Sequence, residues 1–254
     1  MSIKQYLLKE NNWKNIKKEN YKIAILPWGA TEAHNYHLPY GTDIFETEKI
    51  AESSAQKAWD RGTKVIVLPS IPFGVNTQQL DIKLTINLNP SSQFIILKDI
   101  IESLEHSQIN KLIVFNGHGG NDFKQMVREL QKSTKILLTV LNWFNIGDNN
   151  EFFEESGDHA HEMETSMMMY LFPDLVLPLD EAGEGKAKTF KLSGYKEKWA
   201  WAPRQWTKVT KDTGVGNPKK AYAKKGNNYF DFIVNKISEF IVELDKTEQD
   251  EMYE

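Results

Sequence analysis

Four side chains of the kinds that bind metal ions lie within TEAHNYHLPYGTD, residues 31–43. Glu32 and His34 are two positions apart, so their side chains point to the same side of an extended backbone. The HLPYGT turn that follows can return Asp43 to the same point. Imidazole and carboxylate together suit zinc, manganese or iron, and a carboxylate can bridge two ions. The spacing therefore indicates part of a metal site.

Histidines recur in two later clusters: His118 lies in NGHGGN (116–121), and His159 and His161 lie in GDHAHEMETS (157–166). Like the first, each cluster follows an apolar run that is predicted to be a strand. Loops at the carboxyl ends of parallel strands meet at one edge of a sheet, where ligands bind. We therefore expect the three clusters to converge on one site, whereas His106, alone in a polar stretch, is expected at the surface.

The NGHGGN turn has a second interpretation, because glycine-rich turns can also hold phosphate groups. It lacks the lysine of a P-loop and the spacing of a dinucleotide fingerprint. A turn that exposes His118, with glycines that allow close approach of the backbone, is the interpretation we favour.

The stretch HEMETSMMMYLF (161–172) is predicted to be a helix, with Asp158 as its N-cap. Glu162 and Glu164 would then lie roughly 200° apart around the helix. Only one of these two glutamates is expected to face the site.

Apolar runs alternate with helical patterns along the chain. The predicted strands are 23–27, 64–68, 111–115 and 136–141, and the predicted helices include 47–62, 89–108, 121–133 and 218–245. This alternation predicts an α/β fold, a single domain over residues 1–254 with a mostly parallel central sheet and helices on both faces. The segment 181–211 has weak periodicity and is expected to form an excursion, such as a flap.

Composition narrows the function classes. The chain has 254 residues, a net charge of −4 and no cysteine, which excludes disulfides and thiolate metal sites. The chain has neither the basic excess nor the basic stripe that is typical of a nucleic-acid-binding protein. No apolar run reaches the ~20 residues that span a membrane. The first twenty residues lack the apolar core of a secretory signal. We expect a cytoplasmic protein with no nucleic-acid or membrane partner.

Three segments together resemble the creatininase (creatinine amidohydrolase) family: LPWGATEAHNYHLPYGTD, NGHGGN and DHAHEMETSMMMYLFPDLV. A weaker fourth piece is TGVGNPKKAYAKKG (213–226), and the order and spacing agree over roughly residues 20–240. The resemblance implies a βαβ sheet core, a homo-oligomer that is often a hexamer, and two divalent metal ions per chain. It also implies hydrolysis of a C–N bond in a small cyclic amide or formamide.

The resemblance carries a ligand set to this chain: Glu32, His34, Asp43 and His118, with Asp43 bridging the two ions. Creatininase has a further ligand, a glutamate, two residues after the position of His118, where this chain has Gly120. Other members carry a glutamate in a motif that matches Glu162. Glu162 is therefore expected to be the fifth ligand, and Glu164 to orient a neighbouring group.

Asp158 and His159 match an acidic residue and a histidine that transfer protons in creatininase, while His161 stands where the family motif has glycine. The chain also departs from the family near the substrate. DIKLTINLNP (81–90) replaces a segment resembling FPGT, and the tryptophan-bearing flap does not align, although Trp143 lies nearby. Creatinine hydrolysis, deformylation of a pyrimidine intermediate and peptide trimming all stay open.

Two hypotheses of different classes follow. In the first, a metal amidohydrolase activates water, and His159, oriented by Asp158, protonates the leaving nitrogen. In the second, the protein is a non-catalytic, metal-stabilised oligomer that binds a small molecule. The second hypothesis needs no acid–base pair, so the presence of Asp158 and His159 favours the enzyme.

Overall fold

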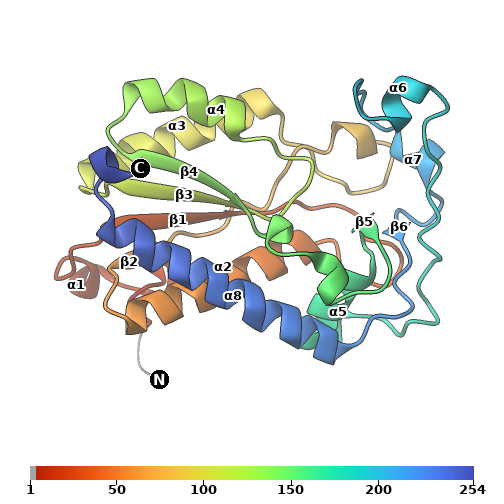
Figure 1. Ribbon diagram of the computed structural model, residues 1–254, viewed down its shortest axis with the longest axis horizontal. Helices are drawn as coiled ribbons and strands as arrows, with labels where there is room; N and C mark the ends of the chain where they lie inside the picture. Colours follow the sequence, from red (N-terminus) through yellow and green to blue (C-terminus); the bar gives the residue numbers. More distant parts are fainter. Residues whose placement is uncertain (1–3) are drawn as a thin grey trace.

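Four parallel strands form the central sheet of the computed structural model, which describes residues 4–254 (Figure 1). Their bounds are β1 Ile23–Trp28, β2 Val65–Val67, β3 Lys111–Asn116 and β4 Leu137–Asn142. The spatial order is β2-β1-β3-β4, and every neighbouring pair is parallel. All four predicted strands are confirmed.

The register places the ends of three strands at one edge of the sheet. Trp28 pairs with Asn116, and Asn116 pairs with Asn142, so β1, β3 and β4 end side by side. The loops that carry the histidine clusters leave from this edge. Their convergence is therefore a consequence of strand register.

Helices cover both faces of the sheet, as predicted (Figure 1). Along β1, Ile23 and Ile25 pack toward α2 (Thr42–Asp60) and α8 (Ala223–Lys246), whereas Ala24 and Leu26 pack toward the opposite face. This alternation follows from the two-residue period of a strand. The opposite face is covered by α3 (Pro90–His106) and α4 (Lys124–Leu130). Because both faces are buried, the strands are almost continuously apolar.

Helix α2 begins at Thr42, five residues before the predicted start, so Asp43 lies in its first turn. Gly29 permits this position, because a Cβ there would lie 2.9 Å from the backbone nitrogen of Ile44. The entrance to α2 thus packs directly on the end of β1. This contact brings Asp43 beside the loop that carries Glu32.

Helix α5 (Glu162–Leu171) packs against α8, and one strand of a small antiparallel pair lies just before it in the chain. The pair consists of β5 (Gly157–His159) and β6 (Val215–Gly216). Asp158 lies in β5, and His161 occupies the N-cap position of α5. The prediction that Asp158 caps this helix was therefore wrong, because the chain stays extended to His159.

The segment 181–211 is mostly irregular and lies beyond the carboxyl end of the sheet, where it carries α6 (Ser193–Lys196) and α7 (Trp206–Val209) (Figure 1). One further short helix, α1 (Trp13–Ile16), lies near the amino end. The 3-10 turns are Leu8–Glu10, Thr77–Gln79 (η2), Gln131–Ser133, Trp143–Asn145, Asn149–Glu151, Pro173–Leu175 and Gln249–Glu251. Within residues 4–254, none of the helices has the length and apolar character needed to cross a bilayer.

Candidate metal centre

The loop after β1 places His34 against two acidic residues. The Nδ1 atom of His34 lies 3.1 Å from the backbone carbonyl oxygen of Glu32, and its Nε2 atom lies 2.9 Å from Asp43 Oδ1. A carbonyl oxygen can only accept, so Nδ1 carries the hydrogen. The Nε2 atom is left facing the carboxylate of Asp43.

The turn after β3 is held by its two asparagines. Asn116 accepts from the backbone N–H of His118 at 3.1 Å and donates to the carbonyl of His118 at 3.0 Å. Asn121 donates to Asn116 at 2.9 Å and accepts from the backbone N–H of Val75 at 3.0 Å. Glycine is required at 117, where a Cβ would overlap the hydroxyl of Thr47 on α2. These contacts fix the direction of the His118 side chain.

His118 repeats the arrangement of His34. Its Nε2 atom donates to the carbonyl of Val75 at 3.1 Å. Its Nδ1 atom faces two carboxylates, at 3.0 Å from Glu32 Oε1 and 2.9 Å from Asp43 Oδ2. A Cβ at Gly120 would overlap both the ring of His118 and the carbonyl of Val75, so this hydrogen bond depends on glycine at 120.

His159 approaches the same group from β5. Its Nε2 atom donates to the carbonyl of Ala33 at 2.8 Å, and its Nδ1 atom lies 3.7 Å from Glu32 Oε1. Its ring centroid lies 4.2 Å from that of His34. A third histidine therefore directs its second nitrogen toward the carboxylate of Glu32.

These contacts together form the donor set of a metal site. Each of the three histidines donates one N–H to a backbone carbonyl, which leaves the other ring nitrogen free to act as a ligand. Three groups of possible ligands result: Glu32, Asp43 and His118; His34, Asp43 and Glu164; and Glu32, His34 and His159. Asp43 belongs to the first two groups, as a carboxylate shared by two ions would. The residues present therefore fit divalent metal ions.

Strong electrostatic coupling accompanies this geometry. Burial would lower the pKa of His34, but Asp43 and Glu32 raise it to about 9. Burial also opposes the charge on His118, yet the facing carboxylates of Glu32 and Asp43 raise its pKa well above the usual range. Despite burial, His118 and His159 lower the pKa of Glu32, and His34 and His118 lower the pKa of Asp43. The site thus favours ionised carboxylates next to a positive charge.

Glu164, and not Glu162, reaches the cluster. Its carboxylate accepts from the backbone N–H of Ala160, and Oε2 lies 3.5 Å from His161 Nδ1. Burial would raise its pKa, but His161, His34 and His159 lower it. Glu162 accepts from Lys225 and from the backbone N–H of Glu154 and Glu155. The structure thus reverses the predicted positions of the two glutamates.

Asp158 also differs from its predicted position. Its Oδ2 atom accepts from Arg204 Nη1 at 2.9 Å, and its side chain is 53% exposed. The ring of His159 is oriented by the carbonyl of Ala33 instead. The alternation of side chains along β5 explains the difference, because neighbouring residues of a strand point to opposite sides.

Two buried polar residues near the cluster, Gln79 and Glu46, were not identified from the sequence. Gln79, on η2, donates to Glu32 Oε2, and its own Oε1 atom is buried with no hydrogen-bond partner within residues 4–254. Glu46 lies one turn after Asp43 on α2, with both carboxylate oxygens buried and unpartnered among the described residues. Trp206 packs its ring edge-on against His159 at 5.3 Å. Two features of the sequence could have indicated them: Gln79 lies in the loop that follows β2, and Glu46 lies three residues after Asp43, on the same face of α2.

The cluster lies in the wall of a cavity of about 1200 Å³. Its lining includes Glu32, Asp43, His118, His159, Glu164 and Trp206. A small organic molecule can therefore reach the candidate ligands directly.

Comparison with known proteins identifies relatives of this chain. The family model described as creatinine amidohydrolase matches residues 9–241. A structure from Bacteroides fragilis, provisionally assigned as a creatinine amidohydrolase, superposes with a TM-score of 0.92 at 41% identity over all of both chains. A 3-dehydro-scyllo-inosose hydrolase from Thermotoga maritima is 29% identical over 61% of this chain and 51% of its own length. A mycofactocin precursor peptide peptidase from Mycobacterium ulcerans is 26% identical over 64% of this chain and 63% of its own length.

Solved creatininases share the fold at 22% identity, over 95% of this chain and 99% of theirs. One described as a Zn-Zn type has a TM-score of 0.80, and one described with manganese has a TM-score of 0.81. The chain spans about half of the inosose hydrolase and less than two thirds of the peptidase. These relatives differ in the substrates that their names state, while the fold is common to the solved structures.

Proposed function

Because the chain belongs to the creatininase family, a family of hydrolases, we propose that it is a metal-dependent amidohydrolase that cleaves a C–N bond of a small amide. The observation that carries this proposal is the convergence of three histidine nitrogens on three carboxylates at the wall of a cavity. Each nitrogen is oriented by a backbone carbonyl, as metal-binding histidines are. A solvated cluster of surface residues would not be buried in this way.

We assign two divalent ions, with Asp43 shared between them. Glu32 and His118 would complete one site, and His34 and Glu164 would complete the other. Glu164 thus takes the place that the sequence suggested for Glu162. The mixture of imidazole and carboxylate suits zinc, manganese or iron. Bound divalent ions would polarise an amide carbonyl and lower the pKa of water.

His159 is the proposed proton carrier of the reaction. Its Nε2 atom is occupied by the carbonyl of Ala33, so only Nδ1 can exchange a proton with a substrate at the cluster. Its edge-on contact with Trp206 keeps the ring in one orientation. Protonation of the leaving nitrogen by His159 would allow the C–N bond to break. Assembly into a homo-oligomer and a cytoplasmic location stay predictions.

A substrate panel tests the proposal. Purified protein loaded with zinc or manganese should release amine from at least one cyclic amide, formamide or short peptide, and a chelator should abolish the release. His159→Gln should keep metal content near that of the unmodified chain and lower turnover by about 100- to 10,000-fold.

A non-catalytic, metal-stabilised binding protein is the competing function. It would bind metal and members of the same panel without turnover, and His159→Gln would then change nothing beyond affinity. A chain with no tight divalent ion at all would refute both functions.

A further inference from the structure

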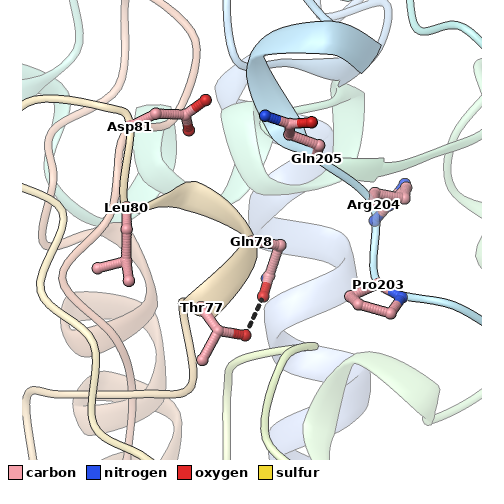
Figure 2. A pocket seen from close by; sticks show the side chains of 7 residues that line it. All are labelled: Thr77, Gln78, Leu80, Asp81, Pro203, Arg204 and Gln205. Carbon is pink, nitrogen blue, oxygen red and sulfur yellow. Dashed lines mark hydrogen bonds between the residues drawn. The ribbon is translucent and has the colours of Figure 1, made fainter.

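A second pocket of about 460 Å³ lies beside the candidate metal centre (Figure 2). One wall is formed by η2 and the residues after it, and the other by residues 203–205, as Figure 2 shows. Thr77, Gln78, Pro203 and Arg204 line both this side pocket and the larger cavity. The two spaces therefore adjoin along these residues.

Arg204 is held at the junction of the two spaces. Its guanidinium carbon lies 4.5 Å from the centre of the Trp206 ring, and Trp206 in turn packs on His159. Trp206 is buried, and its Nε1 atom donates to the carbonyl of Thr213 at 3.0 Å. A planar guanidinium stacked on a fixed ring loses little freedom when it binds a ligand.

Most of the donors of Arg204 are free. A guanidinium has five N–H donors in a fork that matches a carboxylate. Within residues 4–254, only Nη1 of Arg204 has a protein acceptor, the Asp158 carboxylate. That pair is weakly held, because the Arg204 side chain is 35% exposed and the Asp158 side chain 53%. The remaining donors are available to a second anion.

Besides Arg204, the lining of the side pocket carries one charged side chain, Asp81. Thr77, Gln78 and Gln205 offer uncharged polar groups, and Asp81 is engaged by the hydroxyl of Thr207. The turn that forms this wall is also attached to the metal centre, since Gln79 donates to Glu32. The side pocket and the reacting amide would thus be held in a fixed relation.

We propose that the side pocket binds a carboxylate arm of the substrate through Arg204, so that the enzyme acts on small amides that carry a carboxylate. This inference rests on the proposed function of the metal centre. In the reaction, water supplies a hydroxyl to the acyl carbon and a proton to the nitrogen, and the C–N bond breaks. The products are a carboxylic acid and an amine, with no oxidation or reduction.

Matched probes test the inference. The panel contains N-acetylglycine, N-acetyl-β-alanine and N-acetyl-γ-aminobutyrate, and the monoamides of malonate, succinate and glutarate. Each is compared with the counterpart in which the free carboxylate is a carboxamide. For the arm length that fits, kcat/KM of the metal-loaded protein should be about 10-fold or more higher for the carboxylate, as a charge-assisted contact provides.

Arg204→Gln should remove this preference, so that within this variant kcat/KM for the carboxylate falls to about that for its carboxamide, because the charged fork is lost. Arg204→Lys should restore part of the preference, since it keeps the charge and loses the fork. Arg128→Gln, on the exposed side of α4, is the matched control and should behave as the unmodified chain. Equal rates for both members of every pair, or a preference that survives Arg204→Gln, would overturn the inference.

A binding measurement separates this inference from the proposed function. Calorimetric titration of metal-free protein with the same carboxylates should detect binding that is lost in Arg204→Gln and kept in Arg128→Gln. If no probe is hydrolysed but this pattern appears, the amidohydrolase proposal fails for these amides and the anion site stands. If the metal-free protein binds carboxylates and carboxamides equally, the anion site is refuted even when amides are hydrolysed.

Discussion

The carboxylates of Glu162 and Glu164 point to different parts of the molecule, although one residue separates them in the first turn of α5. Glu162 pairs with Lys225 of α8, whereas Glu164 lies with His34 and Asp43. The same turn therefore ties two helices together and supplies the candidate metal centre.

Removing the charge of Glu164 should affect metal content. Glu164→Gln should lose one of two ions, because an amide is a poor ligand beside His34 and Asp43. Elemental analysis after dialysis measures the stoichiometry. Retention of both ions by Glu164→Gln would show that this residue is no ligand.

Removing the charge of Glu162 should affect folding instead. Glu162→Gln leaves Lys225 as a poorly compensated buried cation, and breaking such a pair costs about 3–5 kcal/mol. The partial exposure of Glu154, which also pairs with Lys225, places the expected loss at the lower end. Denaturant titration measures it. Metal loss from this variant at full stability would contradict the assignment.

Three neighbouring glycines offer a matched set of substitutions. Gly117→Ala and Gly120→Ala should destabilise the protein by about 1–3 kcal/mol, as overpacking does, because a Cβ would overlap Thr47 or His118. Gly119→Ala is the control, since nothing lies within 4 Å of a Cβ there. The melting temperature and the metal content of the three variants measure these effects. Equal effects at the three positions would mean that the turn adjusts freely.

Gln79 should influence metal affinity only through its hydrogen bond to Glu32. Gln79→Leu removes the hydrogen bond to Glu32 Oε2 and should weaken metal binding by about 10- to 100-fold, as loss of a group that orients a ligand does. Competition with a chromophoric chelator measures the affinity. The neighbouring Gln78, which lines the side pocket, provides the control: Gln78→Leu should leave the affinity unchanged.

The stability of the metal-free protein should fall as pH rises. The pKa of His34 is raised to about 9 from an ordinary value of 6.5, so the folded state holds this proton more tightly than the unfolded state. The stabilisation is complete below about pH 6.5 and is lost as pH rises through about 9. His118 acts in the same direction. His37 does not contribute to this fall, because burial lowers its pKa to about 4 and its effect on stability is confined to pH values near and below 6.5, where it acts in the opposite direction.

Urea titrations between pH 6.5 and 9.5 in a chelator should show this fall. Metal affinity should change in the opposite direction, since ligand nitrogens must lose their protons before they bind. A chelated protein whose stability is flat or rises across this range would contradict the assigned electrostatics.

The sheet was predictable because its strands are buried on both faces and appear as uninterrupted apolar runs, such as Lys111–Asn116. The convergence of His34, His118 and His159 followed from their positions after strands. Which of Glu162 and Glu164 faces the cluster could not be predicted in this way. It depends on where α5 begins and on Lys225, which pairs with Glu162 and lies 63 residues beyond it. The pairing of Asp158 with Arg204 depends equally on a distant irregular segment that has no periodic pattern.

Helix α2 holds two acidic side chains one turn apart with opposite preferences for a proton. Asp43 lies in the first turn, where His34 and His118 lower the pKa of its carboxyl despite burial and the positive end of the helix macrodipole also favours a negative charge. Glu46 lies one turn farther, where this field has faded, and burial together with Glu164 and Asp43 raises its pKa well above the usual range. The two carboxylates are three residues apart, a rise of about 4.5 Å along the helix, yet one favours its charged form and the other its neutral form. The same field at the start of α5 favours the negative charge of Glu164, so two helix ends offset part of the repulsion among the clustered carboxylates.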